Sequence, residues 1–79
     1  MKSIRLEGTT LKGEGFEPGK AVGVRLLGAA VSNDYVHPDA NGYFDLELAK
    51  AKVAGEYFVQ VQEVGSSTEM PLTTGFKLE

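Results

Sequence analysis

Short stretches of alternating apolar and polar residues, separated by glycine, proline and asparagine, dominate this chain of 79 residues. Val22, Val24 and Leu26 would face one way along a strand, and the stretch from Tyr43 to Leu48 alternates in the same manner. No segment long enough for a stable helix repeats apolar side chains at the helical period. The pattern therefore predicts an all-β fold whose strands each bury one face.

Turn signals divide these strands. Pro18 and Gly19 fill the two central positions of a type II turn, where proline fixes φ and glycine tolerates a positive φ. Within residues 38–42, Asn41-Gly42 is typical of a hairpin connection because it readily supplies positive φ. Residues 49–54 are too few for a stable helix, so we expect a crossover loop there.

Six or seven short strands are expected, and two of them look irregular. Glycines follow the first strand, which contains Ile4 and Leu6, and favour a sheet edge for it. Residues 31–37 alternate least regularly, with Ser32-Asn33-Asp34 available as a turn and Val36 facing inward. Towards the C-terminus, a turn at residues 65–67 ends one strand, and a proline restricts the next segment to an edge or a loop.

The inward positions together predict one core for a single domain spanning residues 1–79. They are Ile4, Leu6, Phe16, Val22, Val24, Leu26, Val36, Phe44, Leu46, Leu48, Tyr57, Val59, Val61, Phe76 and Leu78. The chain has no cysteine, which excludes a disulfide framework, a thiolate nucleophile and any zinc site that uses sulfur. Stability must therefore come from this core alone.

The composition and the net charge limit the classes of binding partner that we expect. Hydrophobic residues make up 42% and charged residues 24% of the chain, as in folded globular proteins. The net charge of -3 lacks the clustered positive charge that nucleic-acid binding requires. The apolar stretch from Leu26 to Val31 is far shorter than the ~20 residues of a membrane helix. We expect neither nucleic acid nor a membrane as a partner.

The ends of the chain bear on its origin. Charges at Arg5 and Glu7 interrupt any segment that could serve as a secretory signal, and neither end resembles a continuing linker. These features favour a complete natural protein over a repeat excised from a longer one.

Three motifs in a fixed order carry a family resemblance: GEGFEPG at residues 13–19, DANGYF at residues 39–44 and GEYFVQV at residues 55–61. Together they resemble the bacterial immunoglobulin-like modules of surface proteins and phage virion proteins. The resemblance implies an immunoglobulin-like antiparallel β-sandwich of six or seven short strands without a disulfide. It also implies that Phe16 lies in the core and that Tyr57 forms a tyrosine corner.

Catalytic and metal-binding groups are sparse. His37 has Asp34 nearby, and serines occur elsewhere, but no nucleophile elbow exists and a histidine before a proline turn suits a strand end. Asp39, Asn41 and Asp45 resemble a fragment of a calcium loop, yet such short side chains usually stabilise the turn itself. We expect a protein that is not an enzyme and has no cofactor or resident metal, and leave weak calcium binding open.

A candidate partner-binding face remains. Phe58, Gln60 and Gln62 would point outward from one strand, and Tyr35 and His37 would join them on the same sheet. Exposed aromatic and amide side chains with few charges are typical of interface cores, although isolated exposed aromatics are also ordinary surface. Both interpretations stay open at this point.

The resemblance implies function by binding. The favoured hypothesis is a phage virion decoration protein whose partners are capsid or other virion proteins. The alternative is an immunoglobulin-like repeat of a bacterial cell-surface or secreted protein that acts as a spacer or adhesion module. A carbohydrate-binding module ranks last, because Tyr35, Tyr43 and Phe58 are not expected to share one face and tryptophan is absent. Self-association is left open.

Overall fold

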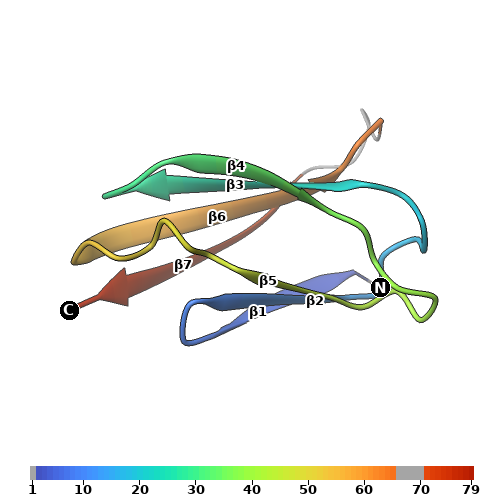
Figure 1. Cartoon of the computed structure of the whole chain (residues 1–79), viewed down its shortest axis with the longest axis horizontal. Helices are drawn as coiled ribbons and strands as arrows, with labels where there is room; N and C mark the ends of the chain where they lie inside the picture. Colours follow the sequence, from blue (N-terminus) through green and yellow to red (C-terminus); the bar gives the residue numbers. More distant parts are fainter. Residues whose placement is uncertain (1, 66–70) are drawn as a thin grey trace.

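Two antiparallel sheets lie face to face in the structure, a computed structural model that describes residues 2–65 and 71–79 (Figure 1). Their strand orders are β1-β2-β5 and β4-β3-β6-β7. The strands are β1 (Ser3–Glu7), β2 (Thr10–Glu14), β3 (Val22–Gly28), β4 (Ser32–Val36), β5 (Phe44–Glu47), β6 (Gly55–Glu63) and β7 (Leu72–Leu78). The predicted all-β architecture with six or seven strands is confirmed.

The core lies between the two sheets and contains every inward position that alternation predicted. Nine of those residues are buried, and the other six are partly buried against them. Phe16 packs edge-on against Phe44 with the ring centroids 5.1 Å apart, which ties the loop before β3 to β5. Leu11 and Ala51 are also buried, and alternation did not identify them.

Pairing of β3 with β6 holds the centre of the larger sheet. Val24 lies opposite Val61 and Leu26 opposite Val59, so the two strands present a continuous apolar surface to the core. Side chains at adjacent positions point to opposite faces, so this register also fixes which residues face outward.

We expected one irregular edge strand before Phe16, but the structure has two regular strands there, β1 and β2. Gly8, with φ of 62°, and Thr9 form a turn, and β2 then pairs with both β1 and β5. Within β2, Leu11 is completely buried and Gly13 leaves room for the ring of Phe44. Gly13 therefore permits close packing of the Phe44 ring against a central strand, whereas we expected the glycine to interrupt the strand.

The strand predicted within residues 31–37 is confirmed as β4, but it is regular, and residues 32–34 pair with β3 and do not form a turn. β4 pairs with β3 along its whole length, from Val36 opposite Val22 to Ser32 opposite Leu26. The neighbouring strand supplies the backbone partners, which outweighs the turn preference of Asn33 and Asp34. Val36 is half-buried against the core, as predicted.

The turn at residues 38–42 forms, but it does not connect a hairpin, because β4 and β5 belong to different sheets. Asp39 Oδ1 accepts hydrogen bonds from the backbone N–H groups of Asn41 at 2.9 Å and Tyr43 at 3.0 Å. Gly42 has φ of 81°, and a Cβ atom there would meet the Phe16 backbone at 2.6 Å. The acidic and amide residues of this segment thus stabilise a crossover between sheets.

The predictions for the turn at residues 17–20 and for the crossover at residues 49–54 are confirmed. Lys20 N–H donates to the Glu17 carbonyl at 3.3 Å and Gly19 has φ of 79°, as a type II turn requires. Residues 49–54 form a crossover without a helix, and β7 is an edge strand. Of the turn expected at residues 65–67, Ser66 and Ser67 lie outside the described residues.

Tyr57 anchors the crossover between β5 and β6. It is completely buried, its ring stacks on Phe76 at a centroid distance of 5.0 Å, and its hydroxyl donates a hydrogen bond to the carbonyl of Val53. A buried tyrosine needs such a partner for its hydroxyl. This bond fastens the loop to the start of β6.

The carboxylates of Glu63 and Glu47 each bond to segments that are distant in the sequence. The buried Glu63 forms an ion pair with Lys2 and accepts a hydrogen bond from the backbone N–H of Glu17 at 3.4 Å. On the outer face of the smaller sheet, the Thr10 and Thr9 hydroxyls donate to Glu47 at 2.6 and 2.7 Å and lower the pKa of its carboxyl. Both carboxylates connect segments that are distant in sequence.

The strands run along the longest dimension of the molecule, whose principal extents are 34 × 23 × 18 Å. β1 begins at one end of this axis and β7 finishes at the other (Figure 1). β1 of the smaller sheet and β7 of the larger sheet are in contact, so the two sheets meet along these two edge strands.

We expect Val59→Ala to lower the free energy of unfolding by about 2 kcal/mol, because it removes buried methyl groups and leaves a cavity. The thermal midpoint should fall by roughly 10 °C. Val31→Ala, at a side chain that is 64% exposed, is the matched control and should change little. An unchanged midpoint for Val59→Ala would contradict its burial.

Tyr57→Phe should lower the free energy of unfolding by about 1 kcal/mol, because the ring stays buried while the hydrogen bond to Val53 is lost. Urea denaturation of the variant and of Tyr43→Phe, whose hydroxyl belongs to an exposed residue, measures the difference. Equal midpoints for the two variants would show that the Tyr57 hydroxyl does not fasten the crossover.

Candidate functional site

Three rows of outward-facing residues lie across the strands of the larger sheet. The rows are Tyr35, Gly23 and Gln62; Asn33, Arg25 and Gln60; and Leu27, Phe58 and Gly75. Each row follows from the cross-strand register, because residues directly opposite one another point to the same face. Arg25 is the one charged side chain in these three rows.

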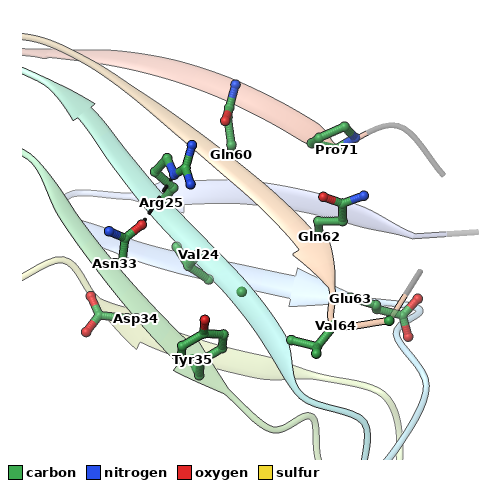
Figure 2. A pocket seen from close by; sticks show the side chains of 12 residues that line it. Val24, Arg25, Asn33, Asp34, Tyr35, Gln60, Gln62, Glu63, Val64 and Pro71 are labelled. Carbon is green, nitrogen blue, oxygen red and sulfur yellow. Dashed lines mark hydrogen bonds between the residues drawn. The ribbon is translucent and has the colours of Figure 1, made fainter. Parts of the chain in front are cut away.

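The first two rows enclose an open depression with a volume of about 590 Å³ (Figure 2). Its floor lies at Gly23, where no side chain separates Tyr35 on β4 from Gln62 on β6. Val64 and Pro71 border its end. The depression thus exists because a glycine occupies an outward position in the middle of a sheet.

Tyr35 forms one wall of the depression. The residue is 70% exposed, and a Cβ atom at Gly23 would lie 3.6 Å from Cε1 of its ring. The ring therefore leans over the glycine and remains widely accessible to solvent. Its hydroxyl has no hydrogen-bond partner among the described residues.

Arg25 and Asn33 form a polar wall. Arg25 Nε donates to Asn33 Oδ1 at 3.3 Å, which orients both side chains across the β3–β4 pair (Figure 2). Alternation placed Arg25 outward. The position of Asn33 depended on recognising β4 as a regular strand, so the sequence interpretation missed this pair.

Phe58 shares the outer face but lies outside the depression. It is 51% exposed, and its ring covers Gly75 on β7, where a Cβ atom would lie 3.3 Å from Cδ1. Tyr35 and Phe58 therefore lie in separate rows of one face, while Tyr43 is exposed on the opposite sheet. The three aromatic residues therefore do not all share one face, as the sequence predicted, because Tyr43 lies with the smaller sheet.

Of the five predicted face residues, His37 alone does not lie in these rows. It follows the last residue of β4, is exposed, and makes no hydrogen bond or ion pair with a described residue. The other four, Tyr35, Phe58, Gln60 and Gln62, all project from the outer face, and three of them line the depression.

Neither a metal-binding cluster nor a membrane-spanning helix occurs among the described residues. Within residues 2–65 and 71–79, no group of three or more His, Asp and Glu side chains could hold a metal ion. Asp39 is engaged with the backbone of its own turn, and Asp45 pairs with Lys12 at 3.4 Å. The same part of the chain contains no helix of the length and apolarity that a membrane span requires.

No protein family, curated protein or solved structure matches this chain. Support for a function therefore comes from the geometry of the outer face and from the sequence motifs.

Gly13 and Gly23 offer a matched pair of substitutions. Gly13→Ala should cost about 1–3 kcal/mol, because the added methyl group would overlap the buried Phe44 ring. Gly23→Ala should change stability by less than about 0.5 kcal/mol, because its methyl group would make only ordinary contact with Tyr35. Chemical denaturation of both variants tests this, and equal losses would contradict an open floor at Gly23.

Proposed function

We propose that this chain is an immunoglobulin-like β-sandwich that acts by binding a protein partner and not by catalysis. The strand order supports the fold assignment: β3-β6-β7 has the C–F–G order of immunoglobulin domains, and β1-β2-β5 has the A–B–E order. β4 then takes the place of the strand that variable-type domains add beside strand C.

The hydrogen bond of Tyr57 is independent support for this fold. A tyrosine corner lies near the start of strand F, and its hydroxyl bonds to the backbone a few residues upstream. Tyr57 occupies that position in β6 and bonds to the carbonyl of Val53. Phe16 is buried, as the resemblance implies.

The observation that carries the binding function is the outer face of the larger sheet, where Tyr35 and Phe58 are exposed in rows of amide, glycine and leucine residues, with the charged Glu56 and Lys77 in the next row beyond Phe58. Arg25 is the one charge between them. Aromatic side chains are enriched and charged ones depleted in interface cores, because burying an aromatic ring is favourable and desolvating a charge is not. We therefore place the protein contact on this face.

The partner is proposed to be a protein of an assembled phage virion, with a bacterial cell-surface or secreted protein as the alternative setting. The sequence resemblance supports this choice. Symmetric particles present many copies of one site, so a modest affinity per copy can still give high occupancy at high local concentration.

Fractionation of the source material by density-gradient sedimentation separates the two settings. Mass spectrometry should find the intact 8.5 kDa chain with virus-sized particles. Peptides found only within a larger envelope-associated polypeptide would instead establish the surface-repeat alternative.

On such particles, Phe58→Ser and Tyr35→Ser should each weaken docking by about tenfold or more, because each removes an exposed ring from the contact. Tyr43→Ser, on the opposite sheet, is the control and should dock normally. Circular dichroism first establishes that all three variants are folded. Unchanged occupancy for both Phe58→Ser and Tyr35→Ser would refute the choice of face.

A further inference from the structure

The depression over Gly23 is lined by side chains that can both donate and accept hydrogen bonds. Gln60 on β6 contributes an amide, and Tyr35 contributes a phenol (Figure 2). Asn33 uses its carbonyl oxygen for Arg25, which leaves its NH₂ group as a donor. These groups suit a ligand whose polar atoms can also both donate and accept hydrogen bonds, as a hydroxyl group can.

Its charges do not favour an ionic ligand. Arg25 is the one cation in its lining, and the exposed carboxylate of Asp34 lies on the neighbouring strand. Glu63 borders the site but is buried and paired with Lys2. A site with one cation and nearby carboxylates lacks the single-sign field that concentrates phosphates or other anions.

Tyr35 adds a flat apolar surface to this polar lining. Its ring leans over Gly23, and the residue is mostly exposed, so a second flat ring could stack on it. Aromatic faces carry partial negative charge and attract the partially positive C–H groups of a ligand. A sugar ring suits this combination, because its hydroxyl groups can bond to the amides and its C–H groups can pack on the exposed aromatic face.

We infer that this depression binds a neutral saccharide, with the C–H face of a pyranose over Tyr35 and its hydroxyl groups bonded to Gln60 and Arg25. The volume of about 590 Å³ lies within the ~300–1,000 Å³ of small-molecule sites. This activity goes beyond the proposed protein docking, since it uses the two rows nearest β4 and does not involve Phe58. It also reverses the low rank that a carbohydrate function received from the sequence.

The inference is tested by NMR titration of the ¹⁵N-labelled protein with maltohexaose, cellohexaose and chitotetraose, and with inorganic phosphate as an anionic control. At least one saccharide should cause saturable shifts confined to Gly23, Asn33, Tyr35, Gln60 and their neighbours. The dissociation constant should be on the order of 1 mM, as expected for an open site with few contacts.

Variants separate this site from the docking contact. Tyr35→Ala should weaken saccharide binding by about tenfold or more, whereas Tyr43→Ala and Phe58→Ser should leave it unchanged. The inference is overturned if no saccharide in the panel gives saturable shifts at 10-fold the expected dissociation constant, or if Tyr35→Ala binds as the unaltered chain does. Loss of particle docking in Tyr35→Ser without any saccharide shift would assign the depression to the protein contact alone.

Discussion

Cross-strand packing between β3 and β6 is the interaction on which the other features of this small fold depend. Val24 against Val61 and Leu26 against Val59 form the middle of a core that no disulfide reinforces. A register slip by one residue would turn this apolar set to solvent, so the pairing is strongly specified. The same register brings Gly23 and Arg25 to the outer face, and the candidate site is thus a direct consequence of how the core packs.

Glycine beside an aromatic ring on the neighbouring strand recurs three times, and its effect depends on the face. Gly13 in the core admits the Phe44 ring against the backbone of β2. On the outer face, Tyr35 covers Gly23 and Phe58 covers Gly75. These two outer rings compensate for the missing side chains by covering the backbone, and both remain largely exposed to solvent. The same local arrangement therefore fills space in the core at Gly13 and leaves exposed rings on the outer face at Gly23 and Gly75.

The sequence was sufficient where a strand is buried on one face and alternates cleanly, as in β3 and β5. It predicted the strand at residues 31–37 but not its regularity, because Asn33 and Asp34 have turn preferences that only the pairing with β3 overrides. It also missed Leu11, since glycines obscured a central strand. The depression was not predictable, because it depends on Gly23 lying between Tyr35 and Gln62, and that arrangement requires two long-range registers.

The opposite placement of the start of β1 and the end of β7 has a mechanical consequence. Tension applied through these two strands would act along the long axis, nearly parallel to the strands and across their backbone hydrogen bonds (Figure 1). In that geometry many bonds of a ladder share the force, whereas a pull across the sheet would break them one after another. A force applied between the start of β1 and the end of β7 would therefore be resisted by shear of many backbone hydrogen bonds at once.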